Sequence, residues 1–290
     1  MEFSQSLPRA LAFGLAAVLS LSVAVAQPAK QTAKEPAKAA KSKAEEFVPQ
    51  SGQAGKDVVW VPTPQALVDR MLDMARVTKD DYVIDLGSGD GRTVITAGKR
   101  GVKAKGIEYN PDMVALSKRN AEKEGVANVV EFVRGDIFES NFSDATVITL
   151  FLLPSLNVKL RPILLDMKPG TRVVSNSFDM GDWTPDEQIQ AGGDCSAWCR
   201  AHFWIIPAKV EGVWQTPIGE MKLEQKYQMV SGTLKIGEVT APVTGKLVGS
   251  DIVFTAGRNI FTGKVNGATM EGTSTDSGKE SKWTIKRGAK

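Results

Sequence analysis

The sequence has little net charge and few of the residue types that bind metals. It carries 36 Lys and Arg against 33 Asp and Glu, a formal net charge of +3 over 290 residues. Because no basic stripe stands out, the sequence lacks the electrostatic signature of a nucleic-acid-binding protein, and we expect no nucleic-acid partner. A metal site built on Cys195, Cys199 and the single histidine, His202, lacks an obvious fourth ligand, so we expect no metal.

The first 26 residues have the pattern of a signal peptide. Arg9 precedes the apolar run 10–25, and Ala24-Val25-Ala26 supplies a small-residue cleavage pattern before Gln27. The run is shorter than the about 20 residues that a membrane span needs. We therefore expect export to the periplasm or beyond, with no stable membrane span once the signal is cleaved.

The alternative is an uncleaved membrane anchor. The positive-inside rule would then leave the rest of the chain in the cytoplasm. This alternative depends on the lysines that follow the apolar run, which are Lys30, Lys34, Lys38, Lys41 and Lys43.

A flexible linker rich in Ala, Lys and Pro is expected over residues 27–58. Its first 20 residues hold almost no bulky apolar side chain, so they cannot bury enough surface to offset chain entropy. A basic patch that contacts an acidic surface is the alternative. The overall composition, 42% hydrophobic and 24% charged, is that of a globular protein. We expect an α/β domain over 59–208 and an antiparallel β domain over 209–290.

Helical and strand signals alternate from Thr63 onward, which indicates a largely parallel sheet with right-handed crossovers. Thr63 is a candidate N-cap with Pro64 in the first helical position, and Pro162 is expected to open a later helix that ends near Lys168. Two further helices are expected over 92–100 and 111–125. The expected strands cover 82–86, 104–108, 129–133, 145–151 and 171–178.

A glycine-rich turn follows the first of these strands. Gly87 and Gly89 allow the backbone to approach a ligand closely, and the helix that follows offers free N–H groups to an anionic group such as a carboxylate. In open α/β sheets, ligands bind beyond the carboxyl ends of the strands, which is where this turn lies. A tight connection without a ligand is the alternative. The whole turn reads Asp85-Leu86-Gly87-Ser88-Gly89-Asp90-Gly91.

Acidic residues close three successive strands. Glu108 can accept both hydroxyls of a ribose, Asp136 can accept from an adenine amino group, and Asp85 can orient the turn and a ligand ammonium. Together they suit a cationic, adenosine-containing ligand without phosphates. The main rival is a nicotinamide cofactor, whose G-x-G-x-x-G fingerprint requires a third glycine where this chain has Arg92.

Several motifs between residues 60 and 204 resemble one enzyme family. The segment from Asp85 to Arg92 resembles the first motif of class I, seven-strand methyltransferases. Val61-Pro62, Glu108-Tyr109-Asn110-Pro111 and Trp183-Thr184-Pro185-Asp186 resemble the family that includes the ATP synthase c-subunit lysine methyltransferase.

This resemblance implies a Rossmann-like seven-strand sheet, S-adenosyl-L-methionine as cofactor, and methyl transfer to a lysine amine of a protein. A small-molecule acceptor is the runner-up. The cofactor-binding residues are then Asp85, Gly87, Ser88, Gly89, Gly91, Glu108 and Asp136.

The methyl acceptor is expected beyond the fourth strand. Phe151 and Asn157 are the candidate acceptor-side residues, and Trp60 and Trp183 are candidates for an aromatic wall, although aromatic residues at such positions are more often part of the core. The stretch 151–157 lacks the Asn/Asp-Pro-Pro-aromatic motif of enzymes that methylate nucleic-acid amines. For Cys195 and Cys199, a small loop disulfide is favoured in an exported chain, with free thiols as the alternative.

After Gly212 the pattern changes to short alternating strands separated by turn residues. Val265-Asn266-Gly267-Ala268 indicates a hairpin, and a meander of six to eight strands, open or closed into a barrel, is expected. Gly212-Val213-Trp214 resembles the opening strand of lipocalin-like barrels. This domain could bind a ligand or partner, or cover the edge of the sheet. An inactive, exported binding protein with a ligand-holding barrel is therefore a further alternative, because a supply of cofactor outside the cytoplasm is not obvious.

Overall fold

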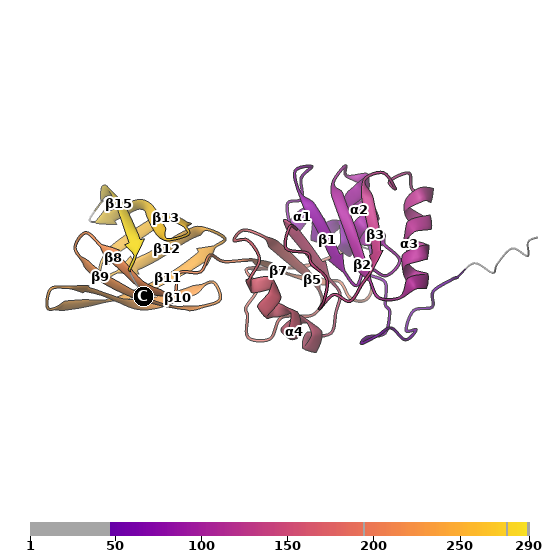
Figure 1. Ribbon diagram of the computed structural model, residues 1–290, viewed down its shortest axis with the longest axis horizontal. Helices are drawn as coiled ribbons and strands as arrows, with labels where there is room; N and C mark the ends of the chain where they lie inside the picture. Colours follow the sequence, from indigo (N-terminus) through magenta and orange to yellow (C-terminus); the bar gives the residue numbers. More distant parts are fainter. Residues whose placement is uncertain (1–46, 194, 277, 289–290) are drawn as a thin grey trace, which may run out of the picture. The chain divides into compact units, whose positions relative to one another are not determined.

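The computed structural model describes residues 47–193, 195–276 and 278–288. In this part of the chain, a seven-stranded sheet with helices is followed by a closed antiparallel barrel (Figure 1). The expected signal peptide and the first 20 residues of the expected linker lie outside the described residues. None of the helices that are described is long and apolar enough to cross a membrane.

The sheet has the strand order β3-β2-β1-β4-β5-β7-β6. The first five strands in this order run parallel, whereas β7 is antiparallel to both β5 and β6. This architecture confirms the predicted Rossmann-like seven-strand sheet. The strands are β1 (Tyr82–Leu86), β2 (Lys103–Glu108), β3 (Val130–Arg134), β4 (Val147–Leu150), β5 (Arg172–Asn176), β6 (Glu187–Gln190) and β7 (Arg200–Ile205).

Within the described residues, four helices pack on this sheet. They are α1 (Gln65–Met74), α2 (Arg92–Lys99), α3 (Pro111–Lys123) and α4 (Pro154–Leu165). The first three contribute to one apolar cluster and α4 contributes to another. Val83 and Ile84, neighbours on β1, belong to different clusters, because successive side chains of a strand point to opposite faces. Both faces of β1 are therefore buried, as is usual for a central strand of a parallel sheet covered by helices.

Two predicted helix starts are wrong. Helix α1 begins at Gln65 with Pro64 in the cap position, and Thr63 instead accepts a hydrogen bond at its buried hydroxyl from the Asn176 amide, at 3.2 Å. Helix α4 is opened by Pro154, and Pro162 lies inside it. A proline in the first turn of a helix loses no hydrogen bond, which is why Pro64 and Pro162 were both expected to occupy first turns. Pro162 instead lies in the interior of α4, where its missing N–H removes one helix hydrogen bond.

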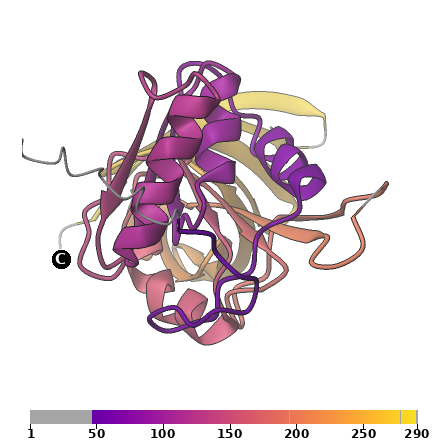
Figure 2. The same ribbon diagram turned by 90° about the vertical axis from the view of Figure 1, so that its right-hand side faces the viewer.

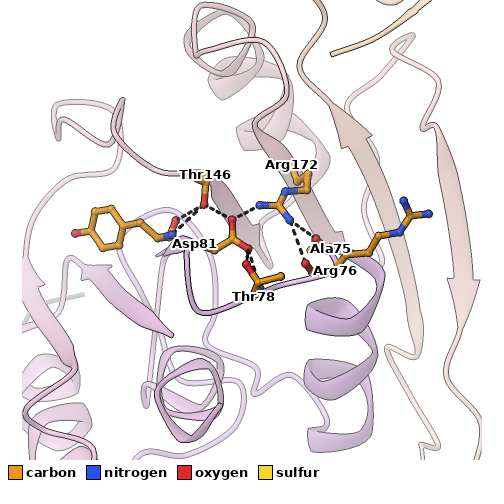
Figure 3. A network of polar contacts seen from close by, with 7 residues as sticks. Ala75, Arg76, Thr78, Asp81, Thr146 and Arg172 are labelled. Atoms are coloured by element: carbon orange, nitrogen blue, oxygen red, sulfur yellow. Dashed lines mark hydrogen bonds and ion pairs between the residues drawn. The ribbon is translucent and has the colours of Figure 1, made fainter. Parts of the chain in front are cut away.

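A polar network ties together the amino-terminal ends of β1, β4 and β5 (Figure 3). The Arg172 guanidinium pairs with the buried Asp81 carboxylate and donates to the carbonyl of Ala75 at 2.7 Å. Asp81 also accepts from the Thr146 hydroxyl at 2.7 Å and from the Thr78 N–H at 2.8 Å. Burial alone raises the pKa of Asp81, but these hydrogen bonds and the nearby cation outweigh burial and lower it.

The second domain is an eight-stranded antiparallel barrel, which confirms the prediction of a small all-β domain. Gly267, with φ +60°, forms the predicted hairpin turn between β13 and β14. The strands are β8 (Gly212–Thr216), β9 (Gly219–Lys226), β10 (Met229–Ile236), β11 (Val239–Val248), β12 (Asp251–Ala256), β13 (Asn259–Asn266), β14 (Thr269–Asp276) and β15 (Lys279–Arg287).

The barrel closes through the pairing of β15 with β8. At this seam, the Arg287 guanidinium stacks 4.5 Å from the ring centre of the fully buried Trp214 and donates to the carbonyl of Lys209 at 2.7 Å. The Trp214 indole N–H donates to the carbonyl of Val210 at 2.8 Å. One buried apolar cluster fills the barrel, so the domain has its own core.

Candidate active site

A cavity lies at the carboxyl ends of β1, β2 and β4, the place where open α/β sheets bind ligands. Its lining includes seven of the nine predicted site residues, and only Gly91 and Asn157 are not among the lining residues. The seven are Asp85, Gly87, Ser88, Gly89, Glu108, Asp136 and Phe151. The sheet thus brings together residues that are up to 66 positions apart in the sequence, from Asp85 to Phe151.

At two positions of the turn after β1, glycine combines a positive φ with too little room for a Cβ. Gly89 and Gly91 have φ of +53° and +84°. A Cβ on Gly89 would lie 2.5 Å from the indole nitrogen of Trp60, and one on Gly91 would lie 2.7 Å from both Phe132 and Ser117. Gly89 therefore leaves room for the Trp60 side chain at the cavity wall, whereas Gly91 allows the start of α2 to pack closely against the sheet.

Asp85 is the most perturbed carboxyl group of the cavity. It is 8% exposed and accepts a hydrogen bond from the Thr149 hydroxyl at 2.6 Å. Burial raises the pKa of Asp85 to about 7; the Thr149 bond opposes this rise, and the negative charges of Glu108 and Asp90 add to it. A buried carboxyl group with this pKa is suited to a cationic partner, which would stabilise its charged form.

Both carboxylate oxygens of Glu108 are held by backbone N–H groups. One carboxylate oxygen accepts from the N–H of Gly89 at 3.0 Å, and the other accepts from the N–H of Asn110 at 2.8 Å. The Asn110 side chain in turn caps α3 by accepting from the N–H of Asp112 at 2.9 Å. Because each carboxylate oxygen has a second lone pair, Glu108 can still accept from two hydroxyls of a ligand.

Asp136 forms an ion pair with Lys56, and one of its oxygens accepts from the N–H of Phe138 at 2.9 Å. The hydrogen bond from Lys56 and that from the Phe138 backbone lower the pKa of Asp136. Lys56 belongs to a segment closed by two bonds between Trp60 and residues 52 and 53. In Figure 2 this segment, in indigo, runs outside the sheet before α1.

The segment 53–60 forms part of the cavity, although the sequence pattern assigned residues up to 58 to a flexible linker. Residues 53–63 all line the cavity, and Trp60 lies against the glycine turn. The apolar run Val58-Val59-Trp60 was the available signal, because it contrasts with the Ala, Lys and Pro repeats before it.

Charge in the cavity favours a cationic ligand without phosphates. The charged residues of the lining are five acids and two bases, namely Asp57, Asp85, Asp90, Glu108, Asp136, Lys56 and Arg92. Both bases are paired, Lys56 with Asp136 and Arg92 with Asp90. Arg92, which replaces the third glycine of a dinucleotide fingerprint, also donates to the Thr63 carbonyl at 2.9 Å. These paired bases are not arranged to hold a pyrophosphate.

The residues of this cavity fit S-adenosyl-L-methionine. Ser88 lines the cavity, and its buried hydroxyl, which lies against Gly106, has no hydrogen-bond partner within the described part of the chain. Glu108 suits ribose hydroxyls, Asp136 suits an adenine amino group, and Asp85 suits an ammonium. The turn glycines bring bare backbone to the same place.

On the acceptor side, Phe151 is half-buried in the cavity wall, whereas Asn157 is fully buried outside it. The Asn157 amide donates to the carbonyls of Phe178 and Asp179, at 3.2 and 3.0 Å, and so holds the loop after β5. Trp183 is also fully buried, and its N–H donates to the Gln228 side chain at 2.8 Å. The expected aromatic wall of Trp60 and Trp183 is therefore wrong for Trp183.

Cys195 and Cys199 form a disulfide, the interpretation that the sequence favoured over free thiols and over a metal site. The disulfide removes both thiols as metal ligands. His202, 7% exposed, has its Nε2 atom 3.2 Å from the Ser177 carbonyl.

Comparison with known proteins agrees with this geometry. A family model described as the ANTKMT methyltransferase domain matches residues 85–187. A protein-lysine N-methyltransferase of Saccharolobus islandicus is 47% identical over 136 residues, which cover 46% of this chain and 84% of that protein. The human ATP synthase c-subunit lysine N-methyltransferase is 33% identical over 136 residues, or 47% of this chain and 58% of that protein.

Among solved structures, an RNA methyltransferase of Salinibacter ruber in complex with S-adenosyl-L-homocysteine is 51% identical. The match covers 52% of this chain and 96% of that chain, with a TM-score of 0.48. The match to the Saccharolobus islandicus protein extends over most of that protein, and the family model covers the part of this chain that carries the glycine turn and the strand-end acids. The chain therefore belongs to the class I S-adenosylmethionine-dependent methyltransferases, in the family that includes the protein-lysine N-methyltransferase of Saccharolobus islandicus.

Proposed function

We propose that the acceptor of this methyltransferase is the side-chain amine of a lysine in a protein. The observation that carries the proposal is the 47% identity to a relative named a protein-lysine N-methyltransferase, of which 84% is covered. The charge of the cavity supports the same conclusion. Five acids against two paired bases attract a cationic side chain and repel a phosphate backbone.

The chemistry needs alignment and exclusion of water more than acid–base groups. When bound, S-adenosylmethionine supplies a methyl carbon on a sulfonium, so the lysine nitrogen forms the new C–N bond as the C–S bond breaks, the bonding electrons stay on sulfur, and the amine proton leaves to solvent. The acceptor amine must be neutral to attack. An apolar wall that includes Leu150, Phe151 and Leu152 favours the neutral amine by desolvation.

The residues of the chain would hold the cofactor in three places. Asp85 would receive the ammonium of its methionine part, Glu108 the ribose hydroxyls, and Asp136 the adenine amino group. The turn residues Gly87 to Gly89 would present their backbone to the ligand. Gly91 supports this arrangement from behind by allowing α2 to pack closely.

We also propose that the chain is exported after cleavage before Gln27. The Ala24-Val25-Ala26 pattern and the disulfide support export, because disulfides persist in oxidising compartments. Mass spectrometry of the mature amino terminus, together with cell fractionation, tests this. An intact Met1 in a membrane fraction would favour the anchored alternative, in which the catalytic domain is cytoplasmic.

The acceptor is tested with radiolabelled S-adenosylmethionine. The purified chain is incubated with poly-L-lysine, with total cell protein, with total RNA and with a small-metabolite pool. We expect label in poly-L-lysine and in protein, recovered as methyl-lysine after acid hydrolysis. Label in RNA or in the metabolite pool alone contradicts the lysine proposal while leaving the methyltransferase assignment intact. Glu108→Gln, which removes one charge, serves as the low-activity control.

A further inference from the structure

Three aromatic side chains come together beside the cofactor cavity. The ring centres of Phe151, Phe178 and Trp198 lie 5.7 to 6.1 Å from one another. Phe151 directly follows β4, Phe178 comes two residues after β5, and Trp198 comes two residues before β7. Because β7 runs antiparallel to β5, its start lies beside the end of β5, which brings Trp198 to this edge.

This cluster connects the cavity with solvent. Phe151 lines the cavity together with the turn residues, and Trp198 is 45% exposed. Phe151 and Phe178 are half-buried. A long side chain that enters from solvent along Trp198 would thus meet Phe151 at the cavity wall.

The cluster is held in place by strained backbone and by a covalent link. Ser177 and Trp198, next to or within the cluster, have φ of +59° and +57°, which bulky residues rarely adopt. Such strain persists only where the surroundings impose it, and it gathers at functional sites. The Cys195–Cys199 disulfide closes the loop that carries Trp198. The Asn157 amide holds Phe178 by donating a hydrogen bond to its carbonyl.

Two buried polar atoms next to the loop after β5, Oδ1 of Asn157 and Nδ1 of His202, have no hydrogen-bond partner among the described residues. The Nδ2 atom of Asn157 donates to the Phe178 carbonyl, and the Nε2 atom of His202 lies 3.2 Å from the Ser177 carbonyl. Both side chains are more than nine-tenths buried. Polar atoms of this kind usually have a partner, so their presence here is consistent with a ligand or water that reaches this loop.

We propose that Phe151, Phe178 and Trp198 form the acceptor wall, the aromatic surface that receives the lysine side chain and retains its methylated ammonium. This inference rests on the proposed lysine acceptor. The ring faces attract an alkylammonium by cation–π interaction and also exclude water around the amine. Of these three residues, only Phe151 was expected on the acceptor side from the sequence, and Asn157 acts as a positioning residue.

The test uses a probe that needs no turnover. Nε-trimethyl-lysine amide is titrated by calorimetry into the full chain saturated with S-adenosylhomocysteine, beside an isosteric neutral tert-butyl analogue. We expect the cation to bind more tightly than the analogue. Trp198→Leu should weaken cation binding about 3- to 30-fold, and Trp198→Phe, which keeps a ring face, should restore most of it.

Three controls separate this inference from the proposed function. The affinity for S-adenosylmethionine should be unchanged in both Trp198 variants, which shows an intact cofactor site. In turnover with poly-L-lysine, Trp198→Leu should raise KM with a smaller effect on kcat, and the double variant Cys195→Ala/Cys199→Ala should shift KM in the same direction. If the wild type methylates lysine and Trp198→Leu leaves KM and cation binding unchanged, the acceptor wall is contradicted and the lysine proposal stands. If lysine is not methylated while cofactor binds, the proposed acceptor itself fails.

Discussion

Asp81 and Asp85 are four residues apart, at opposite ends of β1, and the protein treats them in opposite ways. At the amino-terminal end, Asp81 accepts hydrogen bonds from Thr78, Thr146 and Arg172, and its pKa is lowered. At the carboxyl end, the hydrogen-bond partner of Asp85 is the Thr149 hydroxyl, and its pKa is raised to about 7. The Asp81 carboxylate has its hydrogen-bond and ion-pair partners within the protein, whereas the Asp85 carboxylate lacks a cation, which a ligand would supply.

The same contrast extends to the neighbourhoods of the two groups. Around Asp85 lie the positive-φ glycines, the buried Ser88 hydroxyl and an excess of acids. The network around Asp81 joins three strands and the end of α1 through side-chain and backbone bonds (Figure 3). The polar groups at the amino-terminal end of the sheet therefore stabilise the fold, whereas those at the carboxyl end destabilise the fold and are available to bind a ligand.

Replacing Asp85 by Asn should produce the largest change. It should raise the free energy of unfolding at pH 8 and weaken the binding of S-adenosylmethionine. The folded-state pKa of Asp85 lies above its ordinary value of 3.8, so the folded state favours the protonated form. The associated stability is present below about pH 4 and is lost as the pH rises through about 7. The shift corresponds to at most about 4 kcal/mol, which Asp85→Asn should recover at pH 8. Urea unfolding at pH 8 measures this gain.

The same Asp85→Asn variant should bind S-adenosylmethionine about 10- to 100-fold more weakly at pH 8. It retains an oxygen for the Thr149 hydroxyl but loses the charge that faces the ammonium, and hydrogen bonds between charged groups contribute about 1.5 to 3 kcal/mol. If Asp85→Asn is less stable than the wild type at pH 8 and binds S-adenosylmethionine with the wild-type affinity, the contrast between the two ends of β1 is contradicted.

Breaking the Asp81 network should have the second largest effect, on stability alone. Arg172→Met leaves the Asp81 carboxylate without its cation, and loss of one partner from a largely buried pair costs about 3 kcal/mol. Urea unfolding should show the loss, while calorimetry on the folded protein should show the wild-type affinity for S-adenosylmethionine. Weakened cofactor binding in folded Arg172→Met would contradict the separation of roles.

The pH dependence should be smaller and should again run in opposite directions. Asp85 with a pKa of about 7 is mostly protonated at pH 6 and mostly ionised at pH 8. Cofactor affinity should therefore rise by about tenfold over this range, as stability falls. Calorimetric titrations at pH 6, 7 and 8 test this, and Asp85→Asn should lose most of the dependence of affinity on pH. A wild-type affinity that is flat from pH 6 to 8 would mean that Asp85 does not face the ligand charge.

Lys56→Met should have the smallest effect. The substitution frees the Asp136 carboxylate and removes a cation from the cavity, and exposed ion pairs contribute little to stability. We expect unchanged stability and about a threefold gain in affinity for S-adenosylmethionine. A clear loss of affinity would show that the segment 53–60 binds the cofactor through Lys56.

The sequence was sufficient to predict the carboxyl end of the sheet. Asp85, Glu108 and Asp136 each close a strand or follow one, and parallel strands bring such positions to one edge. Gly87 and Gly89 were identified for the same reason. The parallel strands and the antiparallel β domain follow from periodicity and from hairpin turns such as that at Gly267, and the seven-strand sheet follows from resemblance to a known family. The sequence left open whether the β domain closes into a barrel.

The parts that were missed depend on contacts between distant residues. Lys56 and Asp136 are 80 positions apart, and nothing local to either predicts their pairing. Trp198 is brought to Phe151 only because β7 is antiparallel to β5. Likewise, the partner of Thr63 is Asn176, 113 residues away, so its sequence pattern suggested a helix cap.

The most direct measurement is a calorimetric titration of S-adenosylmethionine at pH 8 into the wild type, Asp85→Asn and Arg172→Met. We predict one binding site per chain with equal affinity in the wild type and Arg172→Met, and at least about tenfold weaker binding in Asp85→Asn. No binding to the folded wild type, or equal affinity in all three proteins, would contradict the account.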